Sequence, residues 1–246
     1  VEVQQAVERI QSPIAPSNLP LLPKGVTPLF SPMTDLISLK LYAEMLDKSK
    51  RFACITFPFG INKTMTDFFL DNIETSPLVF MLFDEKPEGL AINDRQNVYP
   101  VWGVDIDTEL AGLAKDPSLN VKLNLNRHVK FLHTKILLMD PLSADPVVVT
   151  GSANFSNNSV MRNDENMLLI RGDKRAADIY FTEFNRVFNF FYLGMALQSL
   201  KGDEKKTAAQ ASMFLDPTDG WLKKYEPGSM RLKRVQAFAA MEGIGK

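Results

Sequence analysis

The most informative segment of the chain runs from residue 133 to residue 140 and reads His133-Thr134-Lys135-Ile136-Leu137-Leu138-Met139-Asp140. Its apolar part, residues 136–139, predicts a buried strand, and side chains on a strand alternate between the two faces. His133 and Lys135 are two residues apart, so they are predicted to point to the same side. A nucleophile would then lie beside a fixed positive charge.

Two further segments extend this pattern. Residues 145–150 predict a second short buried strand that ends at Gly151. Ser152 and Asn154 follow it two residues apart, so they are predicted to share a face, and small polar side chains there can donate hydrogen bonds to a phosphoryl oxygen. Glu165 comes shortly before a third apolar run. Each predicted strand end therefore carries polar side chains.

The combined pattern resembles the HKD signature of the phospholipase D superfamily: H-x-K-x(4)-D, then G-S-x-N, then an acidic residue, with every position filled. The alternative is three core strands that carry incidental polar residues. That alternative is unfavourable because half-buried polar groups cost free energy unless they have partners. The resemblance implies the fold and the phosphodiesterase chemistry of that superfamily.

The resemblance also implies a role for each residue. His133 attacks phosphorus to form a phosphohistidine, and Glu165 hydrogen-bonds His133, which fixes its tautomer and stabilises the charged ring. Asp140 falls on the opposite strand face, which suits a structural role, and Gly151 marks a strand end. The residues expected to hold the phosphoryl oxygens are Lys135, Ser152 and Asn154. No metal or other cofactor is predicted, because no cluster has metal-ligand spacing.

One histidine cannot easily attack along the line of the bond and also protonate the oxygen that leaves on the far side. In the family, two HKD motifs meet at a pseudo-two-fold axis, and each supplies one histidine. His128 begins a second H-x-K, but Lys135 stands where its Asp is required, and five residues separate it from His133, so it is predicted to face away. The second half is therefore expected from a homodimer partner or from a missing N-terminal half of a longer protein.

Composition and charge limit the size of the domain, the class of partner and the location of the protein. The chain has 246 residues, 45% of them hydrophobic, which is enough for one large α/β domain. The net charge of −1 argues mildly against a domain built to hold duplex DNA, although a neutral protein can carry a local basic groove. A single cysteine, Cys54, favours a reduced compartment. No signal peptide, membrane-spanning run or initiator Met is visible, so cytoplasmic and processed or secreted locations both stay open.

Outside the motif, predicted helices and strands alternate. Helices are predicted over 2–11, 36–49 with Asp35 as the N-cap, 64–74, 107–115 and 173–199. Strands are predicted over 51–57, 78–83, 120–125, 132–139, 146–150 and 166–171. Prolines predict an extended connector over 12–28, and residues 84–103 are predicted to be irregular. This order predicts a layered α/β/α sandwich with a mixed β-sheet, and it resembles one half of the family fold.

Three segments are predicted along the chain: an N-terminal arm and Pro-rich connector over 1–27, a phospholipase D-like catalytic domain over 28–200, and a basic C-terminal extension over 201–246. Within the extension, residues 231–240 predict a basic amphipathic helix. This helix is either solvated or a contact for an anionic substrate such as a lipid surface or a nucleic-acid backbone.

The leading hypothesis is a metal-independent phosphodiesterase of the phospholipase D type, with a phospholipid favoured as substrate and a nucleic acid as the alternative. The resemblance leaves a nonspecific endonuclease open, because single-motif members of the family include such enzymes. The other class of function is a binding module built from a catalytically incomplete half. The retention of every catalytic residue type argues against that second class.

Overall fold

The computed structural model describes residues 2–11, 22–71, 77–87, 97–103, 132–199 and 218–239. The strands of the described residues are β1 (Gly25–Phe30), β2 (Phe52–Phe57), β3 (Leu78–Phe83), β4 (Val98–Trp102), β5 (Ile136–Met139), β6 (Val147–Gly151) and β7 (Asn166–Arg171). The helices are α1 (Glu2–Gln11), α2 (Ile37–Asp47), α3 (Lys63–Asp71), α5 (Asn157–Met161), α6 (Lys174–Ser199) and α8 (Met230–Ala239), with a 3₁₀ helix η4 (Asp219–Tyr225).

The strands form one sheet in the order β1-β7-β6-β5-β2-β3-β4. β2, β3 and β4 run parallel, and the other neighbours pair antiparallel. The parallel pair β2–β3 needs a crossover, and the connection between these strands contains α3. β5, β6 and β7 follow one another through shorter connections, which suits antiparallel pairing. The predicted mixed sheet is therefore confirmed.

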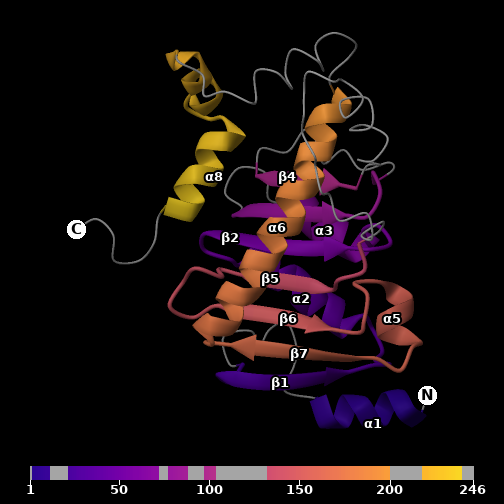
Figure 1. Cartoon of the computed structure of the whole chain (residues 1–246). Coiled ribbons are helices and arrows are strands. Elements are labelled where there is room, and N and C mark those ends of the chain that lie inside the picture. Colours follow the sequence, from indigo (N-terminus) through magenta and orange to yellow (C-terminus); the bar gives the residue numbers. More distant parts are fainter. Residues whose placement is uncertain are drawn as a thin grey trace, which may run out of the picture.

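Helices cover both faces of this sheet. α6 crosses one face, with α8 beside it, while α2 lies behind the sheet (Figure 1). The buried side chains of β5 divide accordingly: Leu137 belongs to the cluster that contains α2, whereas Leu138 belongs to the cluster that contains α6. The predicted α/β/α sandwich is confirmed, and the sheet separates two hydrophobic cores.

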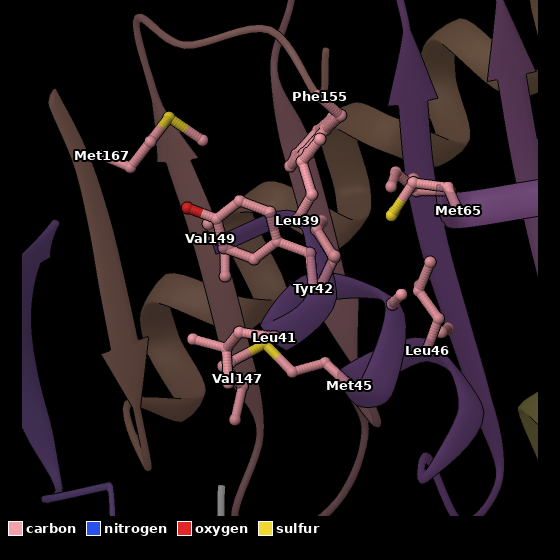
Figure 2. Packing of buried hydrophobic residues seen from close by; sticks show 14 of the residues in the cluster. Leu39, Leu41, Tyr42, Met45, Leu46, Met65, Val147, Val149, Phe155 and Met167 are labelled. Carbon is pink, nitrogen blue, oxygen red and sulfur yellow. The ribbon is translucent and has the colours of Figure 1, made fainter. Parts of the chain in front are cut away.

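The core on the α2 side explains how that helix is held. Figure 2 shows Tyr42 and Met45 of α2 among residues of β6 and β7. The Tyr42 ring meets Phe155 edge-on at a centroid distance of 5.3 Å. Asp35 is not the N-cap of α2: Leu36 occupies that position with φ 56° and ψ 31° and makes no side-chain cap hydrogen bond. A capping side chain needs extended backbone, and both Asp35 and Leu36 are left-handed.

Two strands lie where prolines predicted irregular structure. β1 begins at Gly25, so the extended connector predicted over 12–28 is wrong for residues 25–28, and β4 lies inside the irregular segment predicted over 84–103. Pro28 and Pro100 are each part of these strands. Both strands are sheet edges, where a proline without an N–H group can be tolerated on the unpaired side. The elements predicted over 107–115 and 120–125 lie outside the described residues.

The C-terminal helix α8 is packed against the sheet rather than free in solvent. The Phe238 ring lies 5.3 Å from that of Phe52 and 5.4 Å from those of Phe80 and Phe181. Arg234 lies over the Phe238 ring and donates to Asn189 Oδ1 at 2.7 Å. The helix thus completes the core on the α6 side, and part of its positive charge is used in contacts within the chain.

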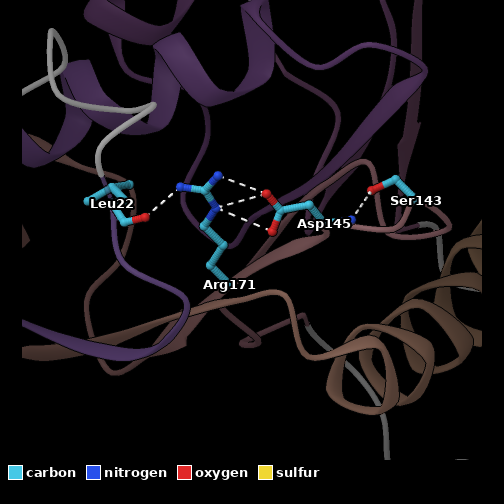
Figure 3. A network of polar contacts seen from close by, with 4 residues as sticks. All are labelled: Leu22, Ser143, Asp145 and Arg171. Atoms are coloured by element: carbon cyan, nitrogen blue, oxygen red, sulfur yellow. Dashed lines mark hydrogen bonds and ion pairs between the residues drawn. The ribbon is translucent and has the colours of Figure 1, made fainter.

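An ion pair joins the segment just before β6 to the last residue of β7 (Figure 3). Arg171 at the end of β7 donates through Nε and Nη2 to Asp145, with the Nη2–Oδ2 distance at 2.8 Å. This hydrogen bond lowers the pKa of the Asp145 carboxyl. Arg171 also donates to the Leu22 carbonyl, so the same side chain anchors the segment that leads into β1.

Among the helices that the structure describes, none is both long enough and apolar enough to pass through a bilayer.

Candidate active site

The histidine and the lysine of the motif precede β5. The strand begins at Ile136, so His133 and Lys135 lie just before it rather than inside it. Leu132, like Ile136, packs into the core on the α6 side, whereas Leu137 packs into the core on the α2 side. His133 and Lys135 lie in the lead-in rather than in the strand, so their shared direction stays a prediction.

Lys135 is a buried cation. The residue is only 6% exposed, and its Nζ donates to the backbone carbonyl of His133 at 2.6 Å. Burial lowers the pKa of the Lys135 ammonium, and the charge of Glu165 partly opposes that shift. The structure therefore brings Lys135 and Glu165 close enough to interact electrostatically. A partly desolvated ammonium beside His133 is well placed to attract a phosphate group.

Replacing Lys135 by Met is expected to raise the stability of the fold. Because its pKa is lowered on folding, the charged ammonium destabilises the fold at pH values below that pKa, and this penalty fades as the pH rises towards 10.5. We expect the thermal midpoint of Lys135→Met to rise by about 2–4 °C at pH 7, the change that about 1 kcal/mol produces in a chain of this size.

The control is Lys174→Met, since Lys174 lies exposed at the start of α6. This control should leave the midpoint unchanged, as surface substitutions usually do. A fall in the midpoint of Lys135→Met would contradict a destabilising buried charge.

His133 is exposed, and its imidazole meets an aromatic ring that sequence reasoning missed. The ring of Phe59 lies edge-on at a centroid distance of 5.9 Å. Phe59 is 72% exposed and follows β2 in the chain, in the connection to α3. Nothing in the local sequence pairs these rings, because the contact depends on β2 and β5 being neighbours in the sheet.

Glu165 lies on the motif side, but its described contacts are with other residues. Its Oε1 accepts from Asn163 Nδ2 at 3.1 Å, and its carbonyl accepts from the Ser31 N–H at 2.9 Å. Within the described residues, no hydrogen bond joins Glu165 to His133. The predicted orienting role of Glu165 therefore remains a prediction.

Ser152 and Asn154, which follow β6, differ from each other in their hydrogen bonding. Ser152 Oγ donates to the Asn166 carbonyl at 3.2 Å and accepts from the Asn166 N–H at 3.0 Å, so its hydroxyl links the ends of β6 and β7. Asn154 is half-buried, and its Oδ1 has no hydrogen-bond partner among the described residues. At Gly151, any Cβ would collide with the Asn166 carbonyl and the Met167 backbone, so only glycine fits.

Asp140 has a structural position at the far end of β5. Its carboxylate is buried and accepts from the backbone N–H groups of Lys50 at 2.8 Å, Arg51 at 2.7 Å and Phe52 at 3.3 Å. These contacts join the end of β5 to the start of β2. Asp140 thus lies away from His133, at the opposite end of the strand.

A cavity of about 520 Å³ lies beside the motif. Its walls are the motif residues 133–136, the end of β6 at 150–152, and Ile179, Tyr180 and Glu183 of α6. Its α6 wall places it on the α6 side of the sheet. Glu183 is paired with Arg186 at 2.6 Å, and this hydrogen bond lowers the pKa of the Glu183 carboxyl. The cavity therefore adjoins His133 and Lys135 from the α6 side of the sheet.

His128 lies outside the described residues. Among the residues that the structure does describe, no group of three or more His, Cys, Asp or Glu side chains could hold a metal ion.

Comparison with known families agrees with the motif. Residues 103–188 match the family model described as "Cardiolipin synthase, PLD-like domain". The matched segment contains His133, Lys135 and Glu165, together with the residues that follow β6. Over the segment that carries the motif, the match confirms the resemblance to the phospholipase D superfamily seen in the sequence.

Several solved structures are similar in fold. Nuc from Salmonella typhimurium, a phospholipase D family member, is 14% identical, with 67% of this chain and 93% of that chain covered and a TM-score of 0.46. NucT from Helicobacter pylori is 11% identical, with 65% and 93% covered and a TM-score of 0.44. Phosphatidylserine synthase from Haemophilus influenzae Rd KW20 is 13% identical, with 88% and 47% covered and a TM-score of 0.43. No curated protein matches this chain in sequence.

Proposed function

We propose that the protein is a metal-independent phosphodiesterase of the phospholipase D type that acts through a phosphohistidine on a phospholipid or a similar phosphodiester. The observation that supports this most directly is the buried ammonium of Lys135 bonded to the backbone of the exposed His133. A buried lysine with one carbonyl partner does little for stability. A positive charge held at the backbone of a residue with an exposed imidazole suits phosphoryl transfer, which needs a cation for the phosphoryl oxygens near the nucleophile.

The reaction has two displacements. In the first, a His133 ring nitrogen attacks phosphorus, the bond to the leaving oxygen breaks, and a second histidine gives that oxygen a proton. In the second, water loses a proton to the second histidine and attacks phosphorus, which breaks the P–N bond and releases the phosphomonoester. Lys135 and Asn154 stabilise the negative charge on the non-bridging oxygens in both steps.

We expect the protein to hydrolyse bis-p-nitrophenyl phosphate at nearly the same rate with and without excess EDTA, because Lys135 supplies the positive charge that a metal would bring. Release of p-nitrophenolate measures the rate. Loss of activity on chelation, restored by one divalent metal, would contradict the mechanism.

Phosphatidylcholine vesicles and plasmid DNA, assayed side by side, separate a phospholipid phosphodiesterase from a nonspecific endonuclease. Cleavage of neither substrate, nor of the activated diester, would favour a binding module.

The second histidine is proposed to come from another copy of the chain, in a two-fold dimer with the two His133 side chains facing each other. Attack and protonation occur on opposite sides of phosphorus, so one histidine per site is insufficient. The exposed ring of Phe59 next to His133 offers apolar surface for such a contact, and a two-fold interface uses the same patch on both copies. The rival source is a second motif in a longer protein.

Mixtures of wild-type and His133→Asn chains, refolded together, test the dimer. If each site needs two His133 residues, activity on an unactivated diester should fall as the square of the wild-type fraction, since only wild-type pairs are complete. Light scattering gives the oligomeric state. A linear fall, or full activity from a monomer at nanomolar concentration, would exclude a shared site.

A further inference from the structure

The backbone that carries the motif separates from β2 at a single buried threonine. The paired residues of β2 and β5 are Ala53 and Met139, Cys54 and Leu138, and Ile55 and Leu137. The next position in this register places Thr56 opposite Ile136, but the backbone pairing ends there. β2 continues beside β3 to Phe57, so the separation comes from the β5 side.

The hydroxyl of Thr56 replaces the missing backbone pairing. The Ile136 N–H donates to Thr56 Oγ1 at 3.0 Å, and Thr56 Oγ1 donates to the Thr134 carbonyl at 2.6 Å. Thr56 is 1% exposed, so protein groups rather than bulk water must satisfy its hydroxyl. Thr56, Thr134 and Ile136 together form what we term the Thr56 clasp.

The clasp holds the backbone on both sides of Lys135. Thr134 and Ile136 are the two neighbours of Lys135, and both are bonded to the same oxygen atom. Lys135 Nζ then reaches the His133 carbonyl at 2.6 Å. These hydrogen bonds, together with the backbone of residues 134–136, therefore link the core of β2 to the backbone of His133. The branched Cβ of threonine restricts its χ1 rotation, which makes it a stiff support.

We propose that Thr56 is a positioning residue whose hydroxyl sets the backbone of residues 134–136, so that His133 and Lys135 present their side chains to one phosphate group. This inference rests on the proposed function of the site. Thr56 acts through the backbone and does not touch the substrate. Its place in an otherwise apolar strand, Phe52–Phe57, is thereby explained, since valine would fill the same space without either hydrogen bond.

Three variants test the clasp. Thr56→Val keeps the shape and removes the hydroxyl, Thr56→Ser keeps the hydroxyl, and Ser49→Ala removes a different buried hydroxyl, which donates to the Leu46 carbonyl at 3.0 Å. We expect kcat to fall about 100-fold in Thr56→Val, the order of loss that a small misplacement of reacting groups produces, with KM changed less than about threefold. Thr56→Ser should restore kcat to within about fivefold of wild type, and Ser49→Ala should leave it unchanged.

Amide hydrogen exchange gives a readout that needs no activity. In Thr56→Val the Ile136 amide loses its acceptor, so its exchange should accelerate at least about tenfold, while the amide of Leu138 in mid-strand stays protected. If Thr56→Val fails to fold, Thr56→Ala, which leaves room for a water, replaces it. Unchanged Ile136 exchange, or a wild-type kcat in Thr56→Val, would overturn the proposal. A wild-type chain that hydrolyses no diester would instead count against the proposed function, and the exchange result would still decide whether the clasp exists.

Discussion

Replacing His133 by Asn is expected to lower diester hydrolysis by about a thousandfold or more, because the amide of Asn cannot form the phosphoryl–nitrogen bond. The fold should be unaffected. His133 is exposed, and its side chain contacts the ring of Phe59. Surface substitutions of this kind change stability by no more than about 0.5 kcal/mol. Initial rates and thermal unfolding of the same preparation measure both effects.

His128→Asn is the matched control, since it removes the other histidine of the chain. It should keep most of the wild-type rate, because its H-x-K lacks the Asp of the motif. If His128→Asn were inactive and His133→Asn active, the assignment of the nucleophile would be wrong. Mass spectrometry of acid-sensitive phosphorylation after rapid mixing with substrate should find the phosphoryl group on His133 in the wild-type chain.

Replacing Asp140 by Ala is expected to cost about 3–5 kcal/mol of stability, because three backbone N–H groups lose a charged acceptor. Asp140 is 5% exposed, so water cannot easily take its place. Its backbone is also left-handed, with φ at 46°, a conformation that Asp and Asn tolerate better than Ala. Urea unfolding followed by circular dichroism gives the change in midpoint and in slope.

Asp164→Ala provides the control for Asp140, since Asp164 is exposed in the turn before β7. This control should change stability by no more than about 0.5 kcal/mol. The rate per folded molecule should stay near wild type in Asp140→Ala, because the carboxylate lies at the end of β5 away from His133. A loss below about 1 kcal/mol, or a folded variant that is inactive, would show that the structural account of Asp140 is wrong.

The local pattern of the sequence was sufficient to predict the strands and the helix that bury a run of apolar residues. The strands predicted over 51–57, 78–83, 146–150 and 166–171 match β2, β3, β6 and β7, and the helix predicted over 173–199 matches α6. Apolar runs and helical periodicity are properties of neighbouring residues, so they can be recognised without the fold. The motif was equally visible, because its residues are close together in the chain.

The edge strands show where local reasoning fails. Prolines in β1 and β4 predicted irregular structure, and proline does break a central strand. Whether a strand lies at an edge depends on the order of the whole sheet, which no short window contains. The N-cap of α2 failed for a related reason: Asp35 has the right side chain, but the turn that leads into the helix gives it a left-handed backbone.

The surroundings of the motif were decided by tertiary structure. The sequence alone predicted which residues carry the proposed chemistry: His133, Lys135, Ser152, Asn154 and Glu165. The position of β5 between β2 and β6 decided which residues contact the motif. It brings Thr56 to Ile136 across 80 positions of the chain, and it brings Phe59 to the His133 ring. Strand order arises from pairing between distant segments, and the hydrogen bonds of that pairing leave no periodic trace in the sequence of either strand.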